Sequence, residues 1–252
     1  MSLHIVQWCS NILQKNTVMR VLVPDGEGPF ATVYLLHGLT EDSSVWARFH
    51  QIELLMRDKP FIVVMPDADR SFYVNDPRSG GLEYENYMME DVLGYVERVF
   101  PAAAESEQRA LVGISMGGDG ALLLAFRHPD AFCATASISG STYYAHDMST
   151  RHLNNDVGAL GRALPRESND LFFLAAHGDL SSYDLALRLS CGLQDHLYDT
   201  NLAFHAHLAR LGVDHQWVEH KGRHDHSTWD SQLPLALDFV VAEMEANRHT
   251  LA

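Results

Sequence analysis

The sequence predicts a single domain, residues 1–252, with an α/β fold: a mostly parallel central sheet of about eight strands, helices on both faces and a small cap insertion. Two observations favour this class. From residue 31 onward, short apolar runs alternate with amphipathic stretches, which is typical of strands buried on both faces and joined by crossover helices. The length of 252 residues and the hydrophobic content of 46% also suit one domain of this kind.

The predicted elements follow from this alternation. Two strands, 3–9 and 17–24, form a hairpin-like pair because polar turns bound them. The apolar runs that follow each end in a turn and span 31–38, 60–67, 109–115, 132–140, 185–192 and 215–222. The amphipathic stretches long enough for crossover helices lie near 46–57, 84–99, 116–128, 199–211 and 229–247. The irregular segment 141–169 is the candidate for the cap.

The charge balance argues against polyanionic partners. The chain has 18 Lys and Arg against 33 Asp and Glu, a formal net charge of −15, which repels nucleic-acid phosphates and anionic lipid surfaces. No stretch approaches the roughly 18 consecutive apolar residues of a membrane-spanning helix. We therefore expect no nucleic-acid partner and no membrane partner. The sequence leaves open whether copies of the chain form a homo-oligomer.

The cysteines indicate a reducing environment. Cys9, Cys133 and Cys191 are widely spaced and odd in number, so they do not suggest a disulfide framework. The N-terminal residues also lack a basic segment followed by a long apolar core. We expect a cytoplasmic protein.

A candidate nucleophile, Ser115, lies in the segment GISMG at 113–117. This segment follows an apolar strand and precedes a helical run, so the serine occupies a sharp strand-to-helix turn that needs flanking glycines. The positive end of the following helix points at the serine oxygen. The alternative is that the glycines only allow close packing of the helix on the strand.

Attack by a serine on an acyl carbonyl needs two donors for the oxyanion. The amide of Met116, directly after the serine, is one candidate. The other is expected in the loop His37-Gly38-Leu39 after the strand ATVYLL (31–36), and we choose the amide of Leu39. His37 in the same loop is expected to pack there instead of transferring a proton.

The acid that orients the base is expected between Ser115 and the histidine in chain order. Asp179 and Asp195 are the candidates. If residues 171–176 formed a strand parallel to the next one, about seven residues would join them, but a parallel crossover needs a dozen or more. Residues 169–178 are therefore predicted to form a short helix that begins at Ser168 or Asn169. This leaves Asp195.

The base is expected one crossover after Asp195, in the segment HKGRHDH. His224 lies where the strand 215–222 has ended, next to Asp195 on the neighbouring strand end. His220 is predicted to lie inside the strand. His226 is two residues further on, and chain order alone does not exclude it.

Several aromatic side chains are candidates for a substrate pocket. Tyr84 and Trp229 are the main ones, together with Phe72 and Tyr73. Aromatic residues at such positions also pack well in the core, so that alternative stays open.

Four motifs together resemble the esterase D-like family of the α/β-hydrolase superfamily. They occur in the family's order across about residues 3 to 245: YLLHGLTEDSSVW (34–46), GISMGGDGAL (113–122), CGLQDHLYDTNLAFHAHL (191–208) and GRHDHSTWD (222–230). The likeness is greatest to tributyrin esterases, with S-formylglutathione hydrolases and acetyl and feruloyl esterases as relatives. It implies an α/β-hydrolase fold and a serine carboxylesterase for small-molecule, short-chain acyl esters, with no cofactor and no metal.

The resemblance also implies roles for individual residues. The nucleophile of the family falls on Ser115, its acid on Asp195 and its base on His224. The family usually has Trp two residues after the catalytic histidine, where this chain has His226. His226 is therefore expected in the pocket wall, and the identity of the ester stays open.

Other functions compete with this interpretation. A metal-dependent hydrolase is suggested by His220, His224, Asp225 and His226, although neighbouring residues on one segment do not by themselves converge on a metal. A non-catalytic binding module would share the fold. A thioesterase acting on S-formylglutathione, or an acyltransferase, would use the same three side chains.

Overall fold

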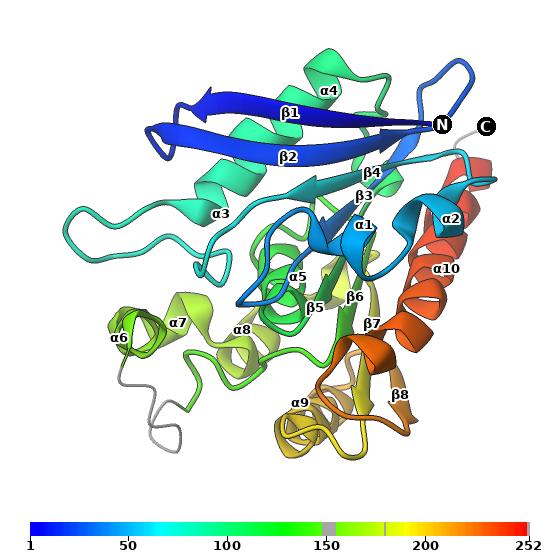
Figure 1. Ribbon diagram of the computed structural model, residues 1–252. Coiled ribbons are helices and arrows are strands. Elements are labelled where there is room, and N and C mark those ends of the chain that lie inside the picture. The colour runs from blue at the N-terminus through cyan, green and yellow to red at the C-terminus, as the bar shows by residue number, and fades with distance from the viewer. Residues whose placement is uncertain (148–154, 179, 251–252) are drawn as a thin grey trace.

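A computed structural model describes residues 1–147, 155–178 and 180–250 of the chain. Eight strands form one sheet in the order β1-β2-β4-β3-β5-β6-β7-β8 (Figure 1). β1 pairs with β2 and β2 with β4 in antiparallel fashion, and the remaining neighbours are parallel. The strands are β1 (Ser2–Ser10), β2 (Lys15–Val23), β3 (Ala31–Leu36), β4 (Phe61–Pro66), β5 (Arg109–Ile114), β6 (Ala134–Ile138), β7 (Ala186–Gly192) and β8 (Gln216–His220).

Helices cover both faces of the sheet. One face packs against α1 (Val45–Arg48), α2 (Ile52–Met56) and α10 (His226–Thr250). The other packs against α3 (Tyr84–Asn86), the π-helix η1 (Tyr87–Val92), α4 (Leu93–Val99), α5 (Met116–Arg127), α8 (Leu171–His177) and α9 (Tyr198–Leu211). The remaining short helices are α6 (Asp156–Ala163), α7 (Arg166–Asn169), η2 (Ser106–Gln108) and η3 (Leu180–Ser182). The predicted α/β class and mostly parallel sheet are confirmed.

Two predicted helices differ in detail. The stretch 46–57 forms two helices, α1 and α2, because the chain turns between them and Gln51 takes a left-handed conformation with φ 46°. The predicted helix at 169–178 is present as α8, but its N-cap is Asp170 and neither Ser168 nor Asn169. The Asp170 carboxylate accepts the amides of Phe172 and Phe173 at 2.9 and 3.4 Å. Asp179 lies outside the described residues.

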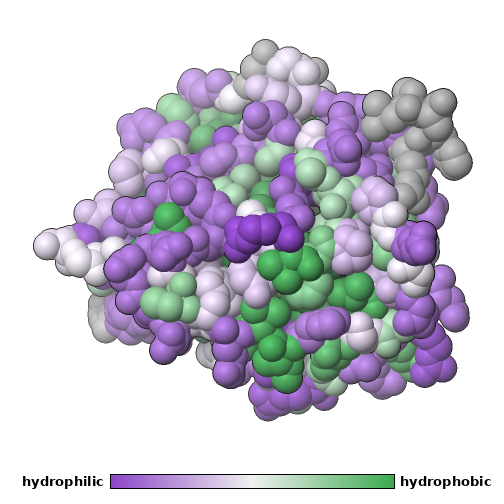
Figure 2. All heavy atoms as spheres, turned by 90° about the horizontal axis from the view of Figure 1, so that it is seen from above, coloured by the Kyte–Doolittle hydropathy of each residue, from purple (hydrophilic) through white to green (hydrophobic). Residues whose placement is uncertain are grey.

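The edge of the sheet exposes apolar side chains. Leu3 and Ile5 on β1 and Val99 at the end of α4 are exposed, and apolar side chains gather on this face of the molecule (Figure 2). Within the described ranges, none of the helices has the length and apolar character needed to cross a membrane.

Candidate active site

Ser115 occupies a tight turn between β5 and α5. Its backbone has φ 53° and ψ −117°, a conformation that a side chain disfavours. The turn brings two chain segments very close: a Cβ on Gly117 would lie 1.9 Å from the Leu36 carbonyl oxygen, and one on Gly113 would lie 2.0 Å from the Gly117 carbonyl oxygen. The glycines therefore permit backbone contacts without which Ser115 could not take this position.

Three side chains from three strand ends form a chain of hydrogen bonds. Ser115 Oγ lies 2.8 Å from His224 Nε2. His224 Nδ1 lies 2.9 Å from Asp195 Oδ2 and 3.1 Å from Oδ1. Ser115 follows β5, Asp195 follows β7, and His224 lies between β8 and α10. Because β5, β6, β7 and β8 are parallel neighbours, their carboxyl ends meet at one edge and bring these residues together.

The environment keeps Asp195 ionised. Burial alone would raise the pKa of this carboxyl, but hydrogen bonds from His224 and from the Leu197 amide, at 2.8 Å, lower its pKa below the ordinary value. A carboxylate accepts hydrogen bonds only, so the His224 proton lies on Nδ1 and Nε2 is free to accept the proton of Ser115. These three residues can therefore perform nucleophilic attack with general-base assistance.

Two backbone amides were expected to bind an oxyanion, those of Met116 and Leu39. Met116 is the first residue of α5, and its amide has no acceptor within that helix. In the loop after β3, the Gly38 amide is already used, since it donates to Glu41 Oε2 at 2.8 Å. Leu39 follows it and lines the same cavity as Ser115.

His37 is buried at the start of this loop, and both ring nitrogens have partners. Nδ1 lies 2.8 Å from the Gly38 carbonyl oxygen, and Nε2 accepts the Ala68 amide at 3.0 Å. Burial lowers the pKa of His37, so the ring is neutral near pH 7 with its proton on Nδ1. These contacts support the packing role expected from the sequence.

Ser115 opens into a cavity of about 500 Å³. Its walls combine the β3 loop, the loop after β7 and the start of α10 with three described residues of the predicted cap. The lining residues are Gly38, Leu39, Thr40, Glu41, Phe72, Ser115, Ser141, Tyr143, Val157, His196, Leu197, His224, Asp225, His226 and Trp229. His226 and Trp229 are part of this wall. The ring of Trp229 meets that of His224 edge-on, with centroids 4.9 Å apart.

Tyr84 and Tyr73 lie elsewhere. Tyr84 donates a hydrogen bond to Asp69 and borders hollows on the side of β2 and of residues 69–82. Tyr73 is fully buried, and its hydroxyl donates to the His37 carbonyl oxygen at 3.1 Å. Neither tyrosine is among the described residues that line the cavity beside Ser115.

The histidine-rich segment does not gather its ligands on one point. Among the described residues, the group with converging ligand atoms is Asp195, His196 and His224. Within it, His224 is already hydrogen-bonded to both Asp195 and Ser115. His220 ends β8 and does not join the group. Both ring nitrogens of His224 therefore already have a side-chain partner.

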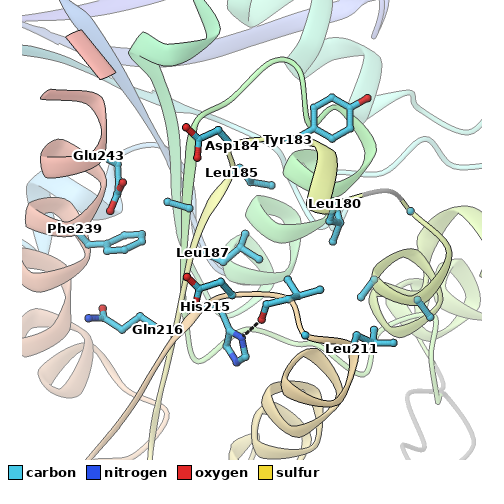
Figure 3. A pocket seen from close by; sticks show the side chains of 17 residues that line it. Leu180, Tyr183, Asp184, Leu185, Leu187, Leu211, His215, Gln216, Phe239 and Glu243 are labelled. Atoms are coloured by element: carbon cyan, nitrogen blue, oxygen red, sulfur yellow. Dashed lines mark hydrogen bonds between the residues drawn. The ribbon is translucent and has the colours of Figure 1, made fainter. Parts of the chain in front are cut away.

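A larger cavity of about 770 Å³ lies at the opposite edge of the sheet, beside the first residues of β7 and β8 (Figure 3). Leu187, Leu211 and Phe239 contribute apolar surface, and the acidic groups are Asp184, Asp214 and Glu243. His215 in its wall uses Nδ1 on the Val213 carbonyl oxygen at 2.8 Å. No serine, threonine or cysteine lines the described part of this cavity, so it offers no hydroxyl or thiol nucleophile. The smaller cavity beside Ser115 is therefore the candidate active site.

Comparisons with known proteins agree with this geometry. The family model described as "Putative esterase" matches residues 10–240. An acetyl esterase from Caldicellulosiruptor saccharolyticus is 25% identical over 273 residues, covering 95% of this chain and 98% of that protein. The Staphylococcus aureus fluorophosphonate-binding serine hydrolase FphF, solved with substrate bound, superposes with a TM-score of 0.87 at 26% identity, over 95% of this chain and 98% of that one.

The fold likeness extends to a further enzyme. The S-formylglutathione hydrolase FrmB from Staphylococcus aureus gives a TM-score of 0.84 at 24% identity, over 96% of this chain and all (100%) of that chain. The fold is thus that of the α/β hydrolases. The chain belongs to the esterase family whose model spans residues 10–240, and it is a serine-type carboxylic ester hydrolase.

Proposed function

We propose that this esterase hydrolyses short-chain acyl esters through an acyl-serine intermediate on Ser115. The observation that carries the proposal is the hydrogen-bonded chain from Ser115 through His224 to Asp195. His224 removes the hydroxyl proton as the serine oxygen attacks the ester carbonyl. Asp195 stabilises the imidazolium that forms, and the amides of Leu39 and Met116 bind the oxyanion.

The second half of the reaction uses the same groups. His224 gives its proton to the leaving alcohol, so the neutral imidazole is restored. It then takes a proton from water, which attacks the acyl-serine carbonyl. Collapse of the second tetrahedral intermediate releases the carboxylic acid and returns the proton to Ser115.

The cavity supports a short acyl chain. It has a volume of about 500 Å³ and is bounded by Phe72 and Trp229, both buried aromatic rings. We assign a cap role to the segment 141–169, since Ser141, Tyr143 and Val157 form part of the wall. Residues 148–154 of this cap lie outside the described residues.

We also propose a reducing, cytoplasmic site of action. The three cysteines are unpaired, with Cys133 and Cys191 buried and Cys9 exposed. Burial raises the pKa of the Cys133 and Cys191 thiols to about 12, so neither is a ready thiolate.

Removal of the nucleophile tests the mechanism. Ser115→Ala should lower turnover of p-nitrophenyl acetate by roughly 10³-fold or more and abolish labelling by a fluorophosphonate, with an unchanged circular dichroism spectrum. Turnover near the wild-type rate would contradict the mechanism. Activity that survives in Ser115→Ala but disappears with a chelator would favour a metal-dependent hydrolase instead.

Acyl preference needs a separate measurement. Hydrolysis of p-nitrophenyl esters from two to twelve carbons should give the highest kcat/KM at the short end, since longer chains exceed the cavity. S-formylglutathione, acetylated sugars and feruloyl esters belong in the same series. A preference for long chains would contradict the short-chain proposal while leaving the roles of Ser115 and His224 intact.

A further inference from the structure

A second row of polar side chains leads from α10 to the loop after β3, and two of its members, His226 and Glu41, line the cavity. Asp230 Oδ1 lies 2.7 Å from His50 Nδ1. His50 Nε2 lies 3.1 Å from His226 Nδ1, and His226 Nε2 lies 3.1 Å from Glu41 Oε1. Two imidazole rings therefore stand in line between two carboxylates. None of these four side chains takes part in the mechanism above.

The number of protons in this row follows from its ends. A carboxylate has no proton to donate, so the ring nitrogens that face Asp230 and Glu41 must each carry one. A lone pair on either nitrogen would face a negative oxygen at about 3 Å. The contact between His50 and His226 needs one more proton, because two facing lone pairs repel. The pair thus holds three protons, one more than two neutral imidazoles, and is a cation.

Burial decides which ring carries the charge. The His50 side chain is fully buried, and burial lowers its pKa. The His226 ring is about one third exposed and stacks on Phe49 with centroids 4.4 Å apart. Desolvation therefore disfavours the extra proton on His50, and the side of the pair that meets water is the His226 ring.

The charged groups around His226 favour a cation there overall. Glu41 from the β3 loop contacts it directly, and Asp230 from the same helix acts through His50. Arg48 lies over the Phe49 ring, 5.1 Å from its centroid, and is the opposing positive charge. Two further titratable residues, His224 and Asp225, directly precede His226 in the chain. His224 is hydrogen-bonded to Asp195 and Ser115.

Glu41 links this cation to the oxyanion loop. Its Oε2 accepts the Gly38 amide at 2.8 Å, and Leu39 follows directly. A Cβ added at Gly38 would lie 3.0 Å from Glu41 Oε2 and 3.6 Å from Ser115 Cβ, so this loop is packed between Glu41 and the nucleophile. A shift of the Glu41 carboxylate therefore changes where the Leu39 amide points.

We propose that His226 is a positioning residue: with His50 it holds one extra proton that fixes Glu41, and Glu41 in turn fixes the Gly38–Leu39 loop for oxyanion binding. This inference rests on the proposed function, since it assigns a support to the same site. When rising pH removes the extra proton, one contact in the row breaks and the loop loses its anchor. The loss affects the transition state more than the ground state, so kcat falls and KM changes little.

Substitutions of Glu41 separate this role from a merely structural one. In Glu41→Gln the amide oxygen still accepts the Gly38 amide, while its NH₂ group donates to an unprotonated His226. The row then no longer needs the extra proton. We expect this variant to keep the low-pH kcat of the wild type and to lose its decline at high pH.

The other variants break the row. Glu41→Ala and His226→Phe should each lower kcat about tenfold at the wild-type optimum, less than the loss of an oxyanion donor itself, with KM within about twofold. His226→Phe keeps the ring stacked on Phe49. Glu53→Gln, at an exposed acid on α2, is the matched control and should match the wild-type profile. A decline in Glu41→Gln identical to that of the wild type would overturn the proposal.

A count of ring protons tests the row without any turnover. Proton–nitrogen NMR spectra of protein labelled with ¹⁵N-histidine should show three ring N–H protons for the His50–His226 pair at pH 6 and two at high pH, assigned with His226→Phe. Two protons at pH 6 would overturn the inference. Absence of esterase turnover in the wild type would contradict the proposed function. The count of ring protons would still show whether the His50–His226 pair holds the extra proton.

Discussion

His224 Nδ1 lies within hydrogen-bond distance of both Asp195 oxygens, at 3.1 and 2.9 Å. The carboxylate also accepts the Leu197 amide at 2.8 Å, so the acid is held by its own loop as well as by the base. This arrangement fixes the His224 ring plane and the position of its proton. The Nε2 lone pair then points at Ser115 Oγ.

Asp195→Asn should lower kcat by roughly 10³- to 10⁴-fold, because the asparagine NH₂ group can donate to Nδ1 and so favour the wrong tautomer of His224. The measurement is kcat for p-nitrophenyl acetate at pH 8, with thermal unfolding to show that the fold is retained. Asp199→Asn, at an exposed acid in the first turn of α9, is the control. A loss below tenfold would remove Asp195 from the proposed mechanism.

A second prediction concerns the turn that holds the serine. A Cβ at Gly117 would lie 1.9 Å from the Leu36 carbonyl oxygen, so Gly117→Ala must push α5 away from β3. We expect it to lower the free energy of unfolding by several kcal/mol or to prevent folding, because an added methyl group has no space in this tightly packed backbone contact. Urea unfolding of the variant and the wild type, together with the yield of soluble protein, would check this prediction.

Gly94→Ala provides the matched comparison. Gly94 lies in α4, and a Cβ there would meet nothing within 4 Å. Alanine favours a helix over glycine by about 1 kcal/mol, so this variant should be slightly more stable than the wild type. Equal stability of the two variants would contradict the claim that the turn needs glycine at position 117 because of the close backbone contact.

The sequence predicted Ser115, Asp195 and His224 for a topological reason. Parallel strands joined by crossovers place successive strand ends at one edge, so chain order and connection length were enough to select candidates. The structure brings these three side chains into one hydrogen-bonded chain. Backbone topology thus carried most of the information about the site.

The support around His226 could not be predicted in this way. The stretch 46–57 has a helical pattern, but the chain breaks between α1 and α2, where Gln51 adopts a left-handed conformation. His50 lies in this break and reaches Asp230 on α10. Apolar periodicity does not report a single residue with positive φ, so the meeting of these segments needed the structure. Tyr84 shows the same limit, since its contact with Asp69 is tertiary.

A third prediction concerns the cap of α8. Asp170 is 1% exposed, accepts the Phe172 amide at 2.9 Å, and pairs with Arg166 and His146, both at 2.8 Å. Burial alone would raise the pKa of this carboxyl, but the bonds from Arg166 and His146 lower it. The stabilisation is therefore present above the ordinary pKa of an aspartate and is lost as pH falls through the lower, folded-state value.

Asp170→Ala should accordingly lower the free energy of unfolding by about 2–3 kcal/mol at pH 7, because the helix cap and the partner of Arg166 and His146 are removed together. The deficit relative to the wild type should shrink as the pH is lowered. Urea unfolding at pH 7 and at a pH well below the ordinary pKa of an aspartate would measure it, with the exposed Glu167→Gln as the control. A deficit that stays constant with pH would show that the ionised form is not what stabilises the helix.

Asp119, one turn after Ser115 in α5, gives the opposite pH dependence. It is 3% exposed, and its Oδ1 has no hydrogen-bond partner. Burial, reinforced by the nearby Asp170 charge, raises its pKa well above the ordinary value. A raised folded-state pKa means that the native protein favours the neutral form of this side chain more than the unfolded chain does. Its contribution is most favourable below the ordinary aspartate pKa and is lost as pH rises toward the folded-state value.

Asp119→Asn replaces the acid by a group that stays neutral at every pH. The melting temperature of this variant should therefore exceed that of the wild type at pH 8 by a few degrees, since about 1 kcal/mol corresponds to about 2–4 °C for a chain of this length. The advantage should diminish at pH 5, because the unfolded wild-type chain then gains less from ionising Asp119. Asp58→Asn, at an exposed position, should show no such trend. A variant less stable than the wild type at pH 8 would mean that the buried carboxyl is ionised and satisfied, contrary to its unpartnered oxygen.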